Sequence, residues 1–157
     1  MHPRPIPARP ARDLRPCILA AVSLLFGQAG ATFAANATEA VVPAPAPELY
    51  FISPRNGDRL PSPVIVRFGL RHMGVAPAGV EFPGTGHHHL IINAPLPPLA
   101  APIPADDHHR HFGKGQTETE ISLPPGRHTL QLLLGDHLHR PHAQPVFSEV
   151  ITIEVTE

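Results

Sequence analysis

The stretch PVIVRFGLR, residues 63–71, decides the fold class. Every second residue from Val64 to Leu70 is apolar and shares one face of an extended strand, whereas Arg67 points the other way. This alternation with a period of two predicts a half-buried β-strand, because successive side chains of a strand point to opposite faces.

The same alternation recurs along the chain between turns rich in proline and glycine. We expect further strands at residues 49–53, 87–93, 117–123, 127–135 and 147–155. No segment has the spacing of an amphipathic helix. Six or seven antiparallel strands in a domain of about 110 residues predict an all-β fold, namely an immunoglobulin-like antiparallel β-sandwich. A small barrel is the alternative.

Composition excludes several functions. The chain has 157 residues and a net charge of −1, which argues against a nucleic-acid-binding surface. A single cysteine excludes a disulfide scaffold and a thiolate metal site. The 12 histidines, in contrast, leave a site built from imidazoles open.

The N-terminal segment is typical of a secretory signal peptide. Prolines and four arginines between positions 4 and 15 precede an apolar stretch at 17–26 and then small residues. We therefore predict a signal peptide at 1–37, a Pro/Ala-rich linker at 38–48 and one domain at 49–157. The mature protein would be periplasmic or secreted, would contain no cysteine and would have no membrane span.

The histidines fall into groups. These are His72 with Met73, then His87, His88 and His89, then His108, His109 and His111, and finally His137, His139 and His142. In an immunoglobulin-like sandwich, the connection between the second and third strands lies at the same end as the connection before the last strand. Three of the groups should therefore converge on one rim, while residues 94–116 form a long loop that can fold back.

Convergent neutral imidazoles bind transition metals. The favoured ligands are His87, His89, His137, His139 and His142, followed by His72 and Met73. A possible second site, or an outer shell, consists of His88, His108, His109 and His111. Copper is the preferred ion, because it leads the divalent affinity order and Met73 offers a thioether that suits Cu⁺; zinc is the alternative.

Other interpretations remain open. The histidines at 87–89 and 108–111 can be polar surface, and clustered imidazoles can respond together to a falling pH. His128, on the apolar face of a strand beside a turn, favours a structural role. No nucleophile elbow or phosphate-binding loop is present, so we expect no enzyme, with a metalloenzyme as the remote alternative.

Three motifs carry a family resemblance: GHHHLII at 86–92, HFGKGQTET at 111–119 and PGRHTLQLLLGD at 125–136. With the sequence around them, they resemble a family of small secreted bacterial β domains of unknown function. The layout LPPGRHTLQLLLGDHLHRP is also similar to the last strands of periplasmic copper-resistance β-sandwich proteins. That second resemblance implies a copper position near His137 or His139, although those proteins often use an N-terminal histidine that this chain lacks.

Together these features predict an exported protein that binds copper or zinc and buffers, carries or delivers the ion. An envelope protein is a possible partner. The alternative is a non-enzymatic envelope interaction module with a pH-sensitive histidine-rich surface.

Overall fold

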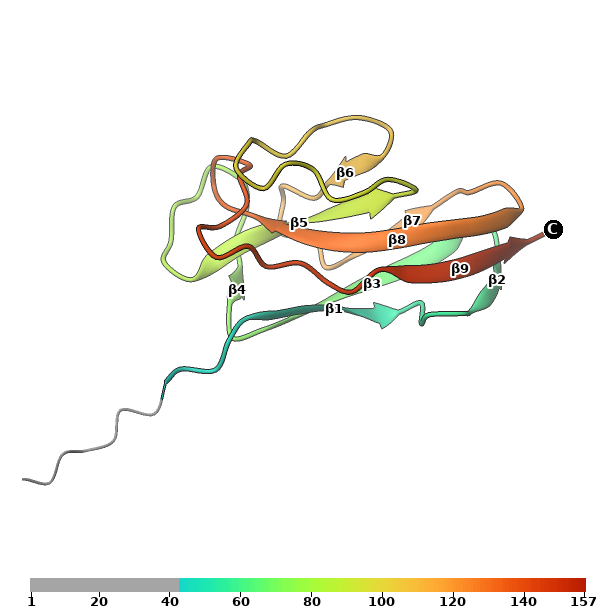
Figure 1. The fold of residues 1–157 in the computed structure, drawn as a ribbon, viewed down its shortest axis with the longest axis horizontal. Helices are drawn as coiled ribbons and strands as arrows, with labels where there is room; N and C mark the ends of the chain where they lie inside the picture. The colour runs from blue at the N-terminus through green and yellow to red at the C-terminus, as the bar shows by residue number, and fades with distance from the viewer. Residues whose placement is uncertain (1–42) are drawn as a thin grey trace, which may run out of the picture. The chain divides into compact units, whose positions relative to one another are not determined.

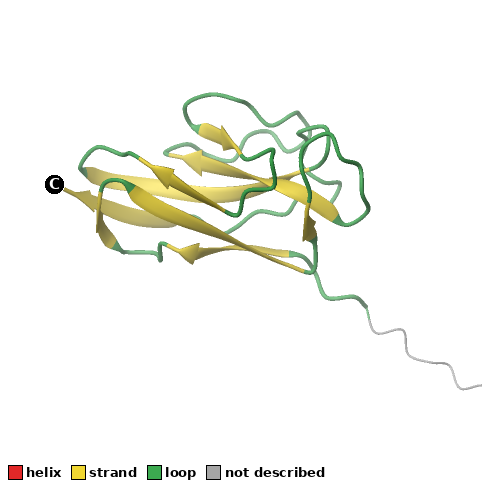
Figure 2. Ribbon diagram, turned by 180° about the vertical axis from the view of Figure 1, so that it is seen from behind, coloured by secondary structure: helices red, strands yellow, loops and turns green. Residues whose placement is uncertain are grey.

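The computed structural model describes residues 43–157, and all of their regular secondary structure is β (Figures 1 and 2). The strands are β1 (Glu48–Ser53), β2 (Arg59–Pro61), β3 (Val64–Arg71), β4 (Gly74–Val75), β5 (Thr85–Ile92), β6 (His109–His111), β7 (Glu118–Ile121), β8 (Gly126–Gly135) and β9 (Ile151–Thr156). No described helix is long and apolar enough to cross a membrane.

The strands form two sheets. One sheet has the order β1-β3-β7, and the other has the order β2-β9-β8-β5-β4, with β6 also paired to β5. The consecutive long strands β3 and β5 lie in different sheets, which is the arrangement of an immunoglobulin-like sandwich. The predicted all-β sandwich is therefore confirmed, although the short strands β2 and β4 pair with β9 and β5 in parallel rather than antiparallel.

The main core lies between the two sheets, where the predicted alternation places apolar side chains. Val64, Val66 and Phe68 of β3 are buried there, and β9 contributes Ile151, Ile153 and Val155. Burying such side chains stabilises the fold by about 1.5–3 kcal/mol each. Packing in this core fixes the position of one sheet relative to the other, and therefore the positions of the loops at each end of the sandwich.

A second, smaller core lies on the outer face of the larger sheet. Ile91 and Leu133 project from that face and pack against Ile103, which belongs to the connection between β5 and β6. Figure 1 shows this connection folding back over β5. Since the loop covers the sheet, β5 and β8 are buried on both faces and read as continuous apolar or histidine-rich runs.

The structure differs from the sequence-based expectation in its short elements. The connection at 94–116 was expected to be a loop, but it contains β6. The last strand begins at Ile151 rather than at 147, although Phe147 bridges to Leu133 beside the sheet. Elements of two or three residues are too short to show a clear period, so the pattern did not reveal β2 or β4 and gave only a weak signal for β6.

The predicted signal peptide at 1–37 and the first part of the linker lie outside the described residues. Residues 43–47 are exposed and have no regular secondary structure, and β1 begins at Glu48, one residue before the predicted domain start.

Candidate metal centre

Strand β5 sorts its three consecutive histidines onto two faces. His87 and His89 project from the outer face of the larger sheet, and their Nε2 atoms lie 3.0 Å apart. His88 projects into the main core, where its ring lies 5.0 Å from that of Phe68. All three are fully buried. The alternation expected from the sequence therefore holds, and it separates a pair of imidazoles from a single one.

Strand β6 adds a third imidazole to the pair. It runs antiparallel to β5 with His111 directly opposite His89, and residues directly opposite each other in such a pair share one face. The ring centroid of His111 lies 5.1 Å from that of His89 and 4.9 Å from that of His87. One nitrogen of each of these three rings lies within 4.8 Å of the others.

The fourth imidazole, His139, comes from the turn after β8. Its Nε2 lies 3.0 Å from Nε2 of His111, and its ring centroid lies 4.9 Å from that of His87 and 6.2 Å from that of His89. Its backbone oxygen accepts a hydrogen bond from the N–H of Ile103, which ties this turn to the loop over the sheet. We call His87, His89, His111 and His139 the histidine cluster.

Two glycines make room for the cluster. A Cβ atom at Gly135, which lies opposite His87 in the ladder between β5 and β8, would come within 2.8 Å of Nε2 of His89. A Cβ atom at Gly113 would overlap the ring of His111 at 2.3 Å. Neither glycine has a positive φ, so their small size rather than their backbone freedom is what the site requires.

Burial lowers the pKa values of three of the cluster histidines. Desolvation, reinforced by the charges that His111 and His139 would carry, lowers the pKa of His87 to about 4. Desolvation and the neighbouring imidazoles lower the pKa of His89 to about 3. The pKa of His111 is also lowered, first by burial and then by His139. At neutral pH these rings are unprotonated, so each keeps a nitrogen lone pair available for a metal ion.

The spacing of the nitrogens fits a bound ion. Zinc–nitrogen bonds are about 2.0–2.1 Å long, so two nitrogens on a tetrahedral ion lie about 3.3 Å apart. The two Nε2–Nε2 contacts are hydrogen bonds of 3.0 Å, slightly shorter than that value, and an ion would replace the proton that lies between the two nitrogens of each pair. Imidazoles suit zinc, copper, iron and nickel, whereas calcium and magnesium prefer oxygen ligands. His87, His89 and His111 could therefore hold one transition-metal ion, and His139 lies beside His111 at the edge of this group.

His137 and His142 lie near the cluster but outside it. They line a neighbouring cavity of about 450 Å³ with Asp136 and Glu81, and Nε2 of His137 lies 4.0 Å from a carboxylate oxygen of Glu81. Nε2 of His142 is buried beside Gly86 without a hydrogen-bond partner. Burial lowers the pKa of His142, although Asp136 opposes this effect.

The remaining predicted ligands also lie elsewhere. His72 is exposed and has a φ of 62°, and Met73 packs against the main core. Nδ1 of His108 lies 2.9 Å from the backbone oxygen of Ile92, and Nδ1 of His109 lies 2.8 Å from a carboxylate oxygen of Asp106.

His128 has the structural environment expected from the sequence. Its Nε2 lies 2.8 Å from the backbone oxygen of Pro124, and its Nδ1 lies 2.8 Å from Nδ2 of Asn93. Both ring nitrogens are thus within hydrogen-bonding distance of a partner.

The sequence-based prediction placed His111 in a possible second site or outer shell, whereas the structure brings its ring next to those of His87 and His89. The missing information was the pairing of β6 with β5, which brings His111 opposite His89. One signal was available, since His109 and His111 alternate around Arg110 as residues of a short strand do.

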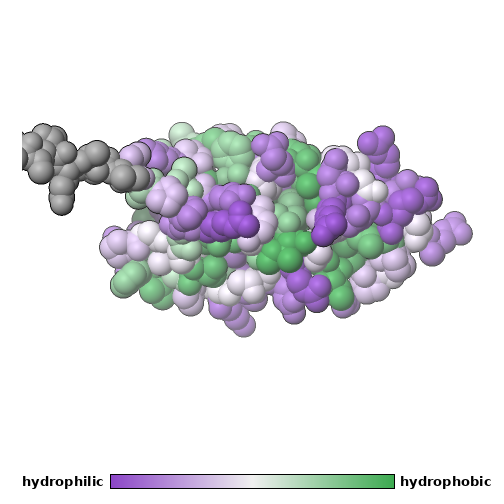
Figure 3. Space-filling view, turned by 90° about the horizontal axis from the view of Figure 1, so that it is seen from below, coloured by the Kyte–Doolittle hydropathy of each residue, from purple (hydrophilic) through white to green (hydrophobic). Residues whose placement is uncertain are grey.

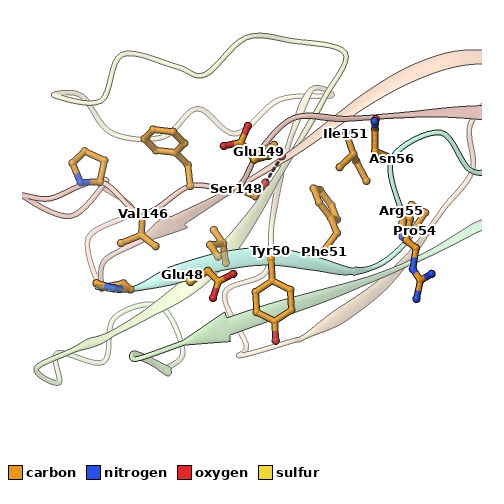
Figure 4. A pocket seen from close by; sticks show the side chains of 14 residues that line it. Glu48, Tyr50, Phe51, Pro54, Arg55, Asn56, Val146, Ser148, Glu149 and Ile151 are labelled. Atoms are coloured by element: carbon orange, nitrogen blue, oxygen red, sulfur yellow. Dashed lines mark hydrogen bonds between the residues drawn. The ribbon is translucent and has the colours of Figure 1, made fainter. Parts of the chain in front are cut away.

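Apart from the cavity lined by His137 and His142, a further groove in the described residues lies away from the cluster. This groove, of about 550 Å³, lies between β1 and residues 145–151, and none of its lining residues is a histidine. Figure 4 shows Phe51 and Ile151 in this groove, with the Ser148 hydroxyl donating to the backbone oxygen of Glu149. Figure 3 shows apolar surface between hydrophilic residues on one face of the protein.

The fold and the cluster define a small immunoglobulin-like β domain with four converging imidazoles. Comparison with known families shows that the chain belongs to the DUF4399 family, a domain of unknown function. The family model matches residues 66–156. No curated protein matches the chain significantly. No solved structure does so either.

Proposed function

We propose that this protein binds one transition-metal ion through His87, His89, His111 and His139 and that it buffers, carries or delivers that ion. The observation that carries the proposal is the convergence of four imidazoles from three separate chain segments. The Nε2 atoms of His87 and His89 lie 3.0 Å apart, as do those of His111 and His139. Four imidazole rings without a carboxylate or thiolate among them match the chemistry of imidazole-bound metals.

The arrangement of the rings favours a tetrahedral ion. With bonds of about 2.05 Å, four imidazoles around a tetrahedral ion have centroids about 5 Å apart in every pair, whereas a square-planar ion would place two pairs about 6.4 Å apart. Five pairs in the cluster are 4.5–5.1 Å apart and one is 6.2 Å apart. This supports Zn²⁺ as the first candidate.

Copper is the second candidate. It leads the divalent affinity order, and Cu⁺ also accepts tetrahedral surroundings. The thioether argument for copper no longer supports it, because Met73 packs against the main core. Imidazole ligands by themselves suit both metals.

Binding and transfer fit the surroundings of the cluster better than catalysis. The cavities described above are lined by residues other than the cluster histidines, although the cavity of about 450 Å³ contains Asp136 and His137 from the turn of His139. His87 and His89 are buried, whereas His111 is exposed and His139 is partly exposed. An ion held between a buried pair and a surface pair can be bound tightly and still exchange with solvent.

We further propose that the protein acts on the export side of the membrane. The support is the basic, then apolar, then small-residue pattern of residues 1–37. The single cysteine, Cys17, falls within this segment, so the mature protein would bind metal through histidine without competition from thiols.

A pH-sensing surface is supported less well. A sensor that works between pH 5 and 8 needs imidazoles that gain a proton in that range. The pKa values of about 4 for His87 and about 3 for His89 lie below it, so these two buried rings do not supply such a response.

Metal titration of the purified protein without a histidine tag tests the proposal. We expect one Zn²⁺ per chain by calorimetry and elemental analysis. The double variant His89→Ala/His139→Ala should lose this uptake, whereas His137→Ala, a control from the same turn, should retain it. Failure of the wild-type protein to bind zinc or copper, or equal uptake by the double variant, would overturn the proposal.

A further inference from the structure

The turn that carries His139 is organised by one carboxylate. Oδ1 of Asp136 accepts hydrogen bonds from the backbone N–H of Leu138 at 2.8 Å and of Arg140 at 2.9 Å. The backbone N–H of Asp136 donates to the oxygen of Arg140 at 2.8 Å, and the N–H of His139 donates to the oxygen of Asp136 at 3.0 Å. Four hydrogen bonds therefore close a turn of five residues.

These bonds hold His139 in a backbone conformation that it would otherwise leave. Its φ of 60° lies in the left-handed region, which is unfavourable for a residue with a Cβ atom. Such a conformation persists only where the surrounding structure enforces it. The carboxylate of Asp136 supplies two of the bonds that do so here.

The four cluster histidines are not held equally. His87 and His89 lie in the middle of the sandwich on β5, and His111 is fixed by the pairing of β6 with β5. His139 lies in a turn outside regular structure, and its ring is 6.2 Å from that of His89, the longest separation in the cluster. His139 is therefore the ligand that can leave with the least change to the fold.

We infer that His139 is the exchangeable fourth ligand and that Asp136 is the residue that positions it. This inference rests on the proposed function. While the turn is closed, four imidazole nitrogens surround the ion. When it opens, His87, His89 and His111 retain the ion and leave one position free, as in three-ligand metal sites. An acceptor of the ion can enter through that position.

Cobalt(II) absorption with added azide tests this assignment, because azide changes the spectrum only where a coordination position is open. The wild-type protein should bind Co²⁺ and show little response to azide. Asp136→Ala should bind Co²⁺ about tenfold more weakly, within the range for loss of a supporting group, and should respond to azide as His139→Ala does.

Two further variants separate positioning from other effects. Asp136→Asn removes the charge but keeps an oxygen acceptor for both N–H groups, so it should behave as the wild type. Asp58→Ala also removes a carboxylate that caps a backbone N–H, that of Arg55, in a turn outside the cluster and should leave the cobalt spectrum unchanged.

Each outcome has one reading. No uptake of Co²⁺ or Zn²⁺ by the wild-type protein overturns the proposed function and this inference with it. Uptake by the wild type together with an unaltered azide response in Asp136→Ala overturns the inference alone. The same holds if Asp136→Asn resembles Asp136→Ala, or if adding Asp136→Ala to His139→Ala weakens binding further, because Asp136 would then act by charge or through another ligand.

Discussion

The two faces of β5 place the same residue type in opposite surroundings. On the outer face, His87 and His89 meet each other and two further imidazoles. On the inner face, His88 packs against Phe68 between the sheets, and neither of its ring nitrogens has a hydrogen-bond partner. The comparison shows that burial alone does not mark a ligand. What distinguishes the outer pair is that other ring nitrogens lie within reach of the same point.

Replacing a histidine on each face should separate them most clearly. His87→Ala removes a buried ligand, so zinc affinity should fall more than 100-fold, beyond the effect of losing a supporting group. His88→Leu, its neighbour, should leave zinc affinity unchanged, because the ring lies on the other side of the sheet. Calorimetric titration of both variants measures the difference. Equal losses in the two variants would remove the distinction between the faces.

Gly135→Ala should sharpen the comparison without removing any ligand. The added methyl group would lie 2.8 Å from Nε2 of His89 and would displace that ring. We expect zinc affinity to fall about 10- to 100-fold, comparable to disturbing the support of a ligand. Gly74→Ala is the matched control, since the closest atom to its Cβ atom would be the methyl group of Thr85 at 3.1 Å, away from the cluster. A wild-type affinity in Gly135→Ala would show that the ring of His89 is not constrained as described.

In the metal-free protein, the histidines on both faces of β5 should make the free energy of unfolding depend on pH. The pKa values of about 4 for His87 and His88 and about 3 for His89 lie below the ordinary value of 6.5. Below pH 6.5 the unfolded chain therefore binds more protons than the folded protein, and the free energy of unfolding must fall as pH decreases toward 4. A pKa lowered by one unit corresponds to about 1.4 kcal/mol per group.

Urea unfolding of metal-free protein at pH 7, 6 and 5 measures this effect. His88→Leu should reduce the slope of stability against pH, since one of the three titrating groups is then missing. Stability that stays constant from pH 7 to pH 5 would contradict the burial of these rings.

The smallest expected effect is on stability at pH 7. A buried polar atom without a partner costs about 1–3 kcal/mol, so replacing His88 by an apolar residue of similar volume should raise the free energy of unfolding by about 1 kcal/mol. The same change at His89 should also be tolerated by the fold while ending metal binding. Equilibrium unfolding measures both variants. A lower free energy of unfolding in His88→Leu would contradict the prediction, because it would mean that the ring of His88 has a polar partner.

Sequence patterns predicted the long strands because β3, β8 and β9 each carry enough alternating residues to show a period. They also predicted that His87 and His89 share a face and that His139 approaches them, since immunoglobulin-like topology brings those connections to one rim. His111 was assigned elsewhere, because the return of residues 94–108 over the sheet depends on packing against Ile91 and Leu133 rather than on a local pattern.

The sequence also could not predict which histidine of this turn, His137, His139 or His142, would join the cluster. His137, His139 and His142 share one short segment, and the hydrogen bonds of Asp136 together with that from Ile103 to His139 determine which ring points at the cluster. Similarly, Met73 follows a histidine in sequence, but the direction of its side chain is set by the main core.

X-ray absorption at the zinc edge of the loaded protein tests the central claim most directly. We predict three or four imidazole nitrogens at about 2.0–2.1 Å, with at least one lost in His111→Ala. A shell of oxygen ligands without imidazole scattering, or a spectrum that does not change when His111 is replaced, would contradict the assignment of the ion to the histidine cluster.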